Sequence, residues 1–299
     1  MANTTVAIFG LGAMGFGMAG ALVRAGLTTH GYDVNPDAVA RFRAAGGAEG
    51  EFDDVAATLD AVVVVVVNAA QTESVLFGEN GIASRLSPGT AVVICATVAP
   101  EFAREMARRC EELGLHYLDA PVSGGTIRAG DGSLSILAAG SPAAFEKAGP
   151  ALEAMSEKVF DMGDQVGAGS SMKAVNQMLV GIQIAAMAEA ITFGISQGVE
   201  PAKFLEVIRQ CAGTSWALES RAPHVIAGDY TPLSAVDIWP KDLGIVLDIA
   251  KDAKFSAPIT AAALQQYLAA SGSGLGKEDD AAVAKVYARN AGLTLPGEG

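Results

Sequence analysis

Short apolar runs alternate with helical patterns through the first half of the chain, as in a parallel sheet with crossover helices. The clearest strand is Ala61–Val67, where six consecutive valines imply burial on both faces, as in a doubly wound sheet. Other strands are expected at Thr5–Phe9, Thr29–Tyr32, Ala91–Ala96, His116–Leu118, Leu134–Ala138 and Lys158–Phe160, with helices over Met14–Ala25 and from Asn35-Pro36 onward.

The rhythm changes after about Gly163. A long helical pattern without proline runs from Ser170 to Gln197, and its apolar composition predicts burial on most sides. The sequence therefore predicts an α/β Rossmann-type N-terminal domain (residues 1–163) and an all-α C-terminal domain (164–299) for substrate binding and oligomerisation. Further helices are expected at Ala202–Cys211, Trp216–Arg221, Asp242–Ala253, Ala257–Ala270 and Ala281–Asn290, with a flexible turn at Ser271–Gly274.

Composition narrows the class of protein. The 299 residues carry a formal net charge of −13, which disfavours nucleic acid and anionic membranes as partners. The start lacks a basic segment before an apolar core, so we expect a cytoplasmic protein. Three scattered cysteines and three scattered histidines predict neither a disulfide framework nor a metal site. The long apolar helix favours a homodimer or homotetramer.

A glycine-rich motif directly follows the first expected strand: Gly10-Leu11-Gly12-Ala13-Met14-Gly15. We expect Gly10 to allow a tight turn, Gly12 to let the backbone approach a pyrophosphate, and Gly15 to let the helix pack closely on the strand. The N–H groups at the helix start would face the anion. The motif therefore predicts a bound dinucleotide, against the alternative of a glycine turn without a ligand.

Asp33 ends the second strand, at the spacing where an acidic residue hydrogen-bonds the adenosine ribose. Its charge would repel a 2′-phosphate, and neither position 34 nor position 35 is arginine, so we expect NAD rather than NADP. The alternative is a helix cap, which Asn35 can already supply. Other strand ends, Val67-Asn68 and Ala96-Thr97, should face the same ligand, although ordinary strand-terminating residues fit them equally well.

Two further segments carry candidate chemistry. Ser123-Gly124-Gly125, within the run Asp119–Gly125, offers a hydroxyl and unobstructed N–H groups that could cradle a carboxylate, with a plain tight turn as the alternative. Lys173, Asn176 and Gln177 share one face of the long helix near its N-terminus. Desolvation and the helix dipole would lower the pKa of a lysine there into a catalytic range. A surface lysine is the alternative.

These motifs, followed by Trp239-Pro240-Lys241-Asp242-Leu243, occur in the order seen in a known family. Over essentially the whole chain, the sequence resembles the β-hydroxyacid dehydrogenases, the family related to 3-hydroxyisobutyrate dehydrogenase. The resemblance implies that Lys173 is the catalytic acid–base. It also implies that Ser123, Gly124, Gly125 and Asn176 bind substrate and that Leu11, Met14, Asn68, Thr97 and Lys241 contact NAD.

Within this family the chain is most similar to the L-threonate dehydrogenase branch, although Ala217–Ser220, Gln183 and Trp239-Pro240 depart from that branch. The resemblance implies NAD-dependent oxidation of L-threonate at C2, with 3-hydroxyisobutyrate dehydrogenase or tartronate semialdehyde reductase as alternatives. Gln177, Gln183 and the segment Trp216–Arg221 are expected to form a polar wall for a hydroxylated acid.

Other classes fit less well. No Tyr-x-x-x-Lys occurs at any tyrosine, which removes the short-chain dehydrogenase mechanism. An imine reductase on the same scaffold would lack Lys173 and favour NADP. A non-catalytic NAD-binding protein would also be expected to have lost Lys173.

Overall fold

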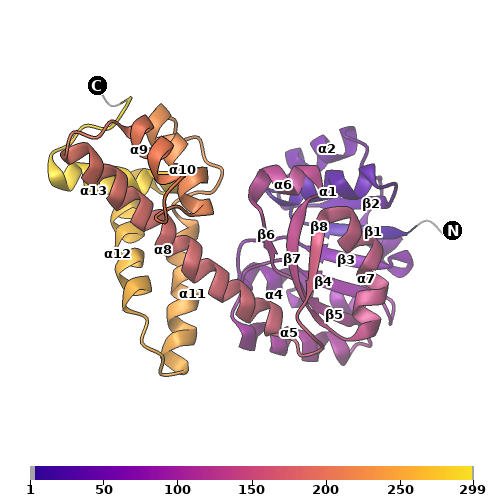
Figure 1. Ribbon diagram of the computed structural model, residues 1–299. Coiled ribbons are helices and arrows are strands. Elements are labelled where there is room, and N and C mark those ends of the chain that lie inside the picture. The colour runs from indigo at the N-terminus through magenta and orange to yellow at the C-terminus, as the bar shows by residue number, and fades with distance from the viewer. Residues whose placement is uncertain (1–3, 298–299) are drawn as a thin grey trace. The chain divides into compact units, whose positions relative to one another are not determined.

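The computed structural model describes residues 4–297 and divides into two compact units, Met1–Lys173 and Ala174–Gly299. The boundary falls inside the long helix α8 (Ala168–Ser196), which begins in the first unit and ends in the second (Figure 1). The first unit is an α/β domain and the second is helical, so the predicted fold class is confirmed.

The first unit contains eight strands and seven α-helices among the described residues. Every strand expected from the sequence is present, with ends that differ by a few residues. The strands are β1 (Thr5–Phe9), β2 (Thr28–Tyr32), β3 (Ala61–Val64), β4 (Ala91–Ile94), β5 (His116–Asp119), β6 (Val122–Ser123), β7 (Leu134–Gly140) and β8 (Ser156–Asp161). The helices are α1 (Gly15–Arg24), α2 (Pro36–Ala44), α3 (Phe52–Val55), α4 (Ala69–Phe77), α5 (Pro100–Glu111), α6 (Gly125–Asp131) and α7 (Pro142–Met155).

The strands form one sheet in the order β2-β1-β3-β4-β5-β7-β6, with β8 pairing with β7. Strands β1 to β5 are all parallel to one another. Strand β7 runs antiparallel to both β5 and β6. The expectation of a wholly parallel sheet is therefore wrong at this edge. Between β5 and β7 the chain forms only the two-residue strand β6 and the short helix α6, so no long crossover returns it in the parallel direction.

Both faces of the central strands are covered, as the valine run predicts. Val63 and Val93 belong to a core on the side of α1, α2, α6 and α7, while Val62 and Val92 belong to a second core on the side of α4 and α5. Strand β3 nevertheless ends at Val64, short of the expected Val67. The Val65 N–H still bonds the Phe9 carbonyl at 2.8 Å, but the chain then leaves the sheet.

The second unit is helical from α8 onward, and α8 packs against later helices through Ile184, Met187 and Ile191. One expectation is corrected: helix α10 continues through Pro223, and Ala222 and Val225 are buried in the same core. After Ala270 the chain makes a π-turn that is broken at Gly274, whose φ is +86°, so the chain does turn within the expected segment. The remaining elements are α9 (Pro201–Ile208), α10 (Trp216–Ala227), α11 (Ile238–Asp252), α12 (Pro258–Ala270), the π-turn (Ser271–Leu275), a 3₁₀ turn (Asp280–Ala282) and α13 (Val283–Ala291).

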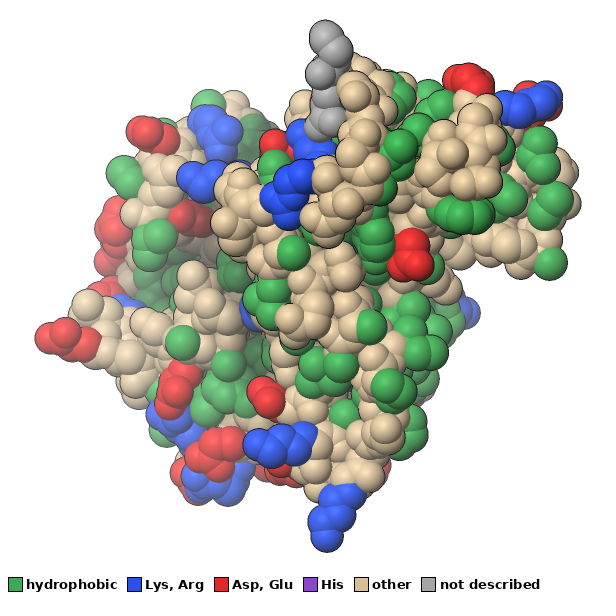
Figure 2. Space-filling model, turned by 90° about the vertical axis from the view of Figure 1, so that its left-hand side faces the viewer, with side chains coloured by type: hydrophobic (Ala, Val, Ile, Leu, Met, Phe, Trp, Pro, Cys, Tyr) green, Lys and Arg blue, Asp and Glu red, His purple; other side chains and the backbone are tan. Residues whose placement is uncertain are grey.

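The expectation that α8 is buried on most sides is wrong for a single chain. Met172, Val175, Leu179 and Phe193 on this helix are 41–65% exposed. The opposite face carries the buried Ile184, Met187 and Ile191. Figure 2, seen from the side of the helical unit, shows apolar side chains reaching the surface between charged groups.

Candidate active site

The glycine-rich loop between β1 and α1 has the geometry that its sequence predicts. Gly10 has φ +99°, and a Cβ there would lie 2.1 Å from the Val65 carbonyl oxygen. A Cβ at Gly15 would lie 1.8 Å from the Gly10 carbonyl oxygen, so both positions require glycine. A Cβ at Gly12, in contrast, would meet nothing within 4 Å. The backbone at Gly12 is thus open to a ligand, as a pyrophosphate would need.

Asp33 lies directly beyond β2 and faces this loop. Its carboxylate accepts hydrogen bonds from the Leu11 N–H at 2.6 Å and the Asn35 N–H at 2.8 Å. Asn35 itself caps α2 by accepting from the Asp37 N–H at 3.0 Å, so Asp33 is not needed as that cap. The two backbone bonds hold the Asp33 carboxylate at one position beside the loop.

A pocket of about 450 Å³ opens at this point, and its walls include Gly12, Ala13, Asp33 and Asn35. The pocket lies between the glycine-rich loop and Asp33, where the motif predicts the adenosine half of NAD. Arg41, from α2, lines the same pocket, and its guanidinium lies 5.2 Å from the centre of the Phe16 ring. Sequence reasoning considered arginines only at positions 34 and 35 and missed Arg41, which the helix brings to the pocket from eight residues beyond Asp33.

The other residues expected to contact NAD, after β3 and β4 and around the glycine-rich loop, differ in their burial and in their partners. Val67 is 51% exposed, and its N–H bonds the Gln71 side chain. Asn68 caps α4 by accepting from the Gln71 N–H at 2.9 Å. Thr97 is half-buried after β4. Met14 precedes the first residue of α1, and the Leu11 side chain is buried. The Asn68 side chain therefore has a structural partner of its own.

Ser123, Gly124 and Gly125 join β6 to α6. The two glycines have φ values of +134° and +73°, and a Cβ at Gly125 would meet nothing within 4 Å. Ser123 pairs with Ser135 across to β7. The segment is thus a glycine-dependent turn with open space at Gly125, which agrees with both the carboxylate-cradle and the tight-turn interpretations.

Asp119, at the end of β5, holds the start of α8. The N–H groups of Gly167 and Ser170 donate to its Oδ2 at 3.0 and 2.9 Å, and the Ser170 hydroxyl donates to Oδ1 at 2.6 Å. Burial raises the pKa of Asp119, while these hydrogen bonds act in the opposite direction. A Cβ at Gly169 would lie 2.3 Å from the Leu137 carbonyl oxygen. The helix start is therefore fixed tightly against the sheet.

Lys173 follows on α8, one turn after Ser170, and is only 7% exposed. Gln177 on the same face is 8% exposed, and Asn176 is half-buried. The predicted inward orientation of this face is confirmed by these values, which exclude a fully exposed surface lysine. A buried lysine is uncommon unless it has a specific task or partner.

Lys241, which lies in the first turn of α11, forms an ion pair with the adjacent Asp242, with 2.6 Å between Nζ and Oδ1. The other carboxylate oxygen, Oδ2, accepts from the Gln177 Nε2 at 2.5 Å. Asp242 is 2% exposed. In the sequence, Asp242 stands out only as part of the motif Trp239–Leu243, and nothing local to it indicates the contact with Gln177.

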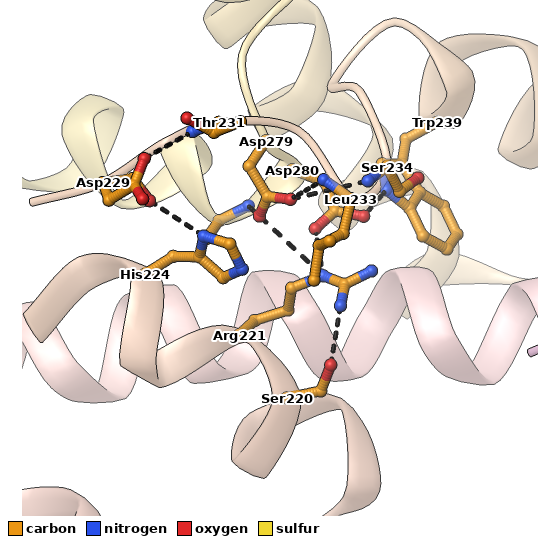
Figure 3. A network of polar contacts seen from close by, with 11 residues as sticks. Ser220, Arg221, His224, Asp229, Thr231, Leu233, Ser234, Trp239, Asp279 and Asp280 are labelled. Carbon is orange, nitrogen blue, oxygen red and sulfur yellow. Dashed lines mark hydrogen bonds and ion pairs between the residues drawn. The ribbon is translucent and has the colours of Figure 1, made fainter. Parts of the chain in front are cut away.

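Arg221 does not contribute a free charge to the expected polar wall. Its Nε donates to Oδ1 of Asp280 at 2.6 Å, and the Trp239 Nε1 donates to the other oxygen of Asp280 at 2.9 Å (Figure 3). Neighbouring Asp279 lies 3.8 Å from the same Arg221 nitrogen. This cluster is buried inside the helical unit. The remaining part of the expected wall includes the exposed Trp216 and the half-buried Gln183.

Comparison with known proteins agrees with this geometry. Residues 5–163 match the NAD binding domain of 6-phosphogluconate dehydrogenase, and residues 167–287 match the NAD-binding domain of NADP-dependent 3-hydroxyisobutyrate dehydrogenase. The chain is 47% identical to an L-threonate dehydrogenase of Cupriavidus necator, over 99% of both proteins. It is equally identical to one of Escherichia coli K12, over 98% of this chain and 96% of that one.

Among solved structures, a 3-hydroxyisobutyrate dehydrogenase from Salmonella typhimurium aligns with a TM-score of 0.88 and 44% identity, covering 95% of this chain and 100% of that one. The fold, the dinucleotide loop and these relatives define an NAD-dependent oxidoreductase that acts on hydroxy acids. The chain belongs to the 3-hydroxyisobutyrate dehydrogenase-related family of β-hydroxyacid dehydrogenases, in the branch of the L-threonate dehydrogenases.

Proposed function

We propose that the chain oxidises L-threonate at C2, with Lys173 as the acid–base residue. The observation that carries this proposal is the burial of Lys173 on the same helix face as Gln177 and Asn176, just after the point where Asp119 fixes the helix. Burial favours a neutral lysine, the form that can accept a proton. The C2 assignment rests on the similarity to L-threonate dehydrogenases.

In the proposed reaction, separate residues transfer the proton, bind the substrate hydroxyl and bind the carboxylate. Bound NAD supplies the acceptor for a hydride from the carbinol carbon. The Lys173 Nζ takes the hydroxyl proton as that hydride leaves, and returns it in the reverse reaction. Asn176, one turn further along α8, holds the substrate hydroxyl. Ser123 and the N–H groups at Gly124 and Gly125 hold the carboxylate.

The choice of substrate rests on polarity. Gln177 on the buried face of α8 already has two partners, Asp242 and Asn176, so the amides that remain for the extra hydroxyls of a sugar acid are those of the half-buried Asn176 and Gln183. A branched apolar acid such as 3-hydroxyisobutyrate would leave polar groups unpaired, at about 1–3 kcal/mol each. Because the solved relative from Salmonella typhimurium is a 3-hydroxyisobutyrate dehydrogenase, that acid is the substrate to compare, with tartronate semialdehyde as the third candidate.

We expect kcat/KM with NAD to be at least about 10-fold higher for L-threonate than for 3-hydroxyisobutyrate, the ratio that one unpaired polar group implies. Steady-state rates of NADH formation with both acids measure this ratio. D-threonate, the enantiomer, serves as the control for stereochemistry. A higher kcat/KM for 3-hydroxyisobutyrate would overturn the substrate but leave the role of Lys173 intact.

The preference for NAD is proposed to depend on Asp33. Asp33→Ser combined with Val34→Arg should shift the ratio of kcat/KM values toward NADP by about 10-fold or more, because the charge facing the 2′-phosphate changes sign. Val34 is fully exposed and can carry the longer side chain. Asp37→Ser, an exposed change on α2, is the matched control. An unmodified protein that already used NADP as efficiently would contradict this assignment.

We also propose a cytoplasmic homodimer or homotetramer without nucleic-acid or membrane partners. The support is the exposed apolar face of α8, which includes Val175, Leu179 and Phe193. By length and composition α8 could also cross a membrane, but its other face packs in the helical core and carries Gln177. Light scattering after gel filtration should give a mass of two or four chains, and Leu179→Glu should lower it. A wild-type monomer at micromolar concentration would contradict this proposal.

A further inference from the structure

A chain of polar contacts joins α8 to α11 inside the helical unit. It begins at Lys241, whose ammonium group pairs with Oδ1 of Asp242 at 2.6 Å. Oδ2 of Asp242 accepts from Nε2 of Gln177 at 2.5 Å, across 65 residues of sequence. Oε1 of Gln177 then accepts from Nδ2 of Asn176 at 3.0 Å. Two helices are thus connected through four side chains.

The contact chain has a direction that chemistry imposes. An ionised carboxylate only accepts hydrogen bonds, so Gln177 must turn its NH₂ group toward Asp242. Its carbonyl oxygen then faces Asn176, which must present its own NH₂ group in return. The Oδ1 of Asn176 is thereby turned away from Gln177. The charge on Asp242 thus selects one of the two orientations that each amide could adopt.

The surrounding packing leaves this arrangement little freedom. A Cβ at Gly181, one turn beyond Gln177, would lie 2.8 Å from Leu243 and 3.0 Å from Trp239, so α8 and α11 approach closely here. The Trp239 ring stacks on Tyr267, with 5.4 Å between ring centres, and its Nε1 is bonded to Asp280. Tyr267 donates to the Gly181 carbonyl at 2.7 Å. The beginning of α11, where Asp242 lies, is therefore held beside α8.

We propose that Asp242 is a positioning residue, which fixes the orientation of the Asn176 amide through Gln177. The inference rests on the proposed function, in which Asn176 holds the substrate hydroxyl. With one N–H of its Nδ2 donated to Gln177, Asn176 holds the other N–H in a fixed direction, and this N–H donates to the oxygen of that hydroxyl, whose own proton goes to Lys173. A reversed amide would set the lone pairs of Oδ1 against the hydroxyl oxygen in its place. Asp242 therefore acts on the reaction without touching the substrate.

The experiment exchanges the acceptor and donor roles of two residues. Asp242→Asn removes the charge that orients the amides of Gln177 and Asn176, so both amides can reverse. Gln177→Glu places a second carboxylate next to that of Asp242, and the two repel each other. Each single variant should lower kcat/KM for L-threonate by about 10- to 100-fold, the usual scale for a misplaced contact. In the double variant, the new carboxylate at position 177 can accept from both the new amide at position 242 and the Asn176 amide, so the orientation of Asn176 returns. We expect the double variant to recover at least about 10-fold of the loss.

Two readouts separate positioning from a merely structural role. The kcat and the KM for the hydroxy acid should both change in the single variants and both recover in the double variant. The KM for NAD should change wherever Asp242 is replaced, including the double variant, because Lys241 then loses its ion pair, so it does not follow this recovery. Thermal unfolding of the same proteins reports the contacts themselves, and the double variant should unfold at a higher temperature than either single variant. Asp248→Asn, an exposed change on α11, is the matched control and should leave every value unchanged.

The outcomes are distinct. Near wild-type kcat/KM in Asp242→Asn, or recovery of the unfolding temperature in the double variant without recovery of kcat/KM, would overturn the positioning role. If the wild-type protein oxidises 3-hydroxyisobutyrate instead, the same comparison is made with that acid. If it oxidises no hydroxy acid, the proposed function has failed and the role of Asp242 in it fails too, while the unfolding temperatures still decide whether the contact chain exists.

Discussion

Replacing Lys173 with alanine is expected to lower kcat by about 100-fold or more, the usual effect of losing a general acid–base group. The Lys173 side chain is only 7% exposed, so a base dissolved in the solvent cannot easily take its place. The start of its helix is held by Asp119, so the position of residue 173 should not change in the variant. NAD should still bind, because the dinucleotide loop at Gly10–Gly15 is far along the chain and unchanged. Single-turnover rates of NADH formation, together with the dissociation constant for NAD, measure both effects.

The matched control is Lys251→Ala, which removes an exposed lysine from α11. It should leave kcat within about twofold of the wild-type value, as expected for a surface change. Lys173→Arg tests the proton-transfer role in another way, because a guanidinium keeps the positive charge but does not release a proton at neutral pH. Near-normal turnover in Lys173→Ala or in Lys173→Arg would contradict the proposed mechanism.

Replacing Arg221 with methionine is expected to lower the free energy of unfolding by about 3–5 kcal/mol, because one partner of a buried ion pair is lost. Asp280 would retain only the Trp239 N–H as a partner among the contacts in Figure 3. Asp279 is less affected, because the N–H groups of Leu233 and Ala281 bond its carboxylate at 2.8 and 3.0 Å. Urea or thermal unfolding of the whole protein measures the loss.

The loss should depend on pH in a direction that distinguishes a charge effect from a packing effect. Burial raises the pKa of Asp280, and Arg221 opposes this rise, so the variant should raise the pKa further. A carboxyl whose folded pKa exceeds its unfolded value contributes most stability below the unfolded pKa, and this contribution falls as pH rises through the folded pKa. Arg221→Met should therefore cost more at pH 8 than at pH 5.

Arg209→Met is the control for the change in net charge, since Arg209 is an exposed arginine in the same unit. It should change the free energy of unfolding by less than about 0.5 kcal/mol. A loss in Arg221→Met that was equally small, or that did not vary with pH, would show that Asp280 does not depend on the guanidinium.

Local patterns predicted most of the α/β unit. The valines of β3 and β4 alternate between two cores, which is the burial that the apolar run requires. The glycine motif could be placed because Gly10 and Gly15 have steric requirements that only glycine meets. The antiparallel direction of β7 was not predicted. The hydrophobic period of a strand does not specify its direction, and the short connection at residues 120–133 is the one local sign that β7 does not run parallel to β5.

The candidate site was predicted in part. Periodicity alone placed Lys173 and Gln177 on a buried face of α8, and the structure confirms that face. Arg41, which lines the pocket beside Asp33, and Asp242, which is proposed above as a positioning residue, were not recognised from the sequence. Asp242 meets Gln177 across 65 residues, and a contact at that separation leaves no local pattern in a single sequence. The charge of Arg221 was assigned to the substrate wall because sequence spacing cannot show that Asp280 lies beside it.

The hydrogen bonds from Ser170 and Gly167 to Asp119 also fix the rotation of α8 about its own axis, and so the direction in which each later side chain points. Each residue of an α-helix turns the chain by about 100° and advances it by about 1.5 Å. A single residue inserted between Ser170 and Lys173 would therefore aim the lysine a quarter-turn or more away while leaving every side chain of the chemistry present. The direction of the lysine thus depends on the number of residues that separate it from Ser170: an insertion in the loop 164–166, before the hydrogen bonds to Asp119, should leave that direction unchanged, whereas one within the first turn of α8 should not.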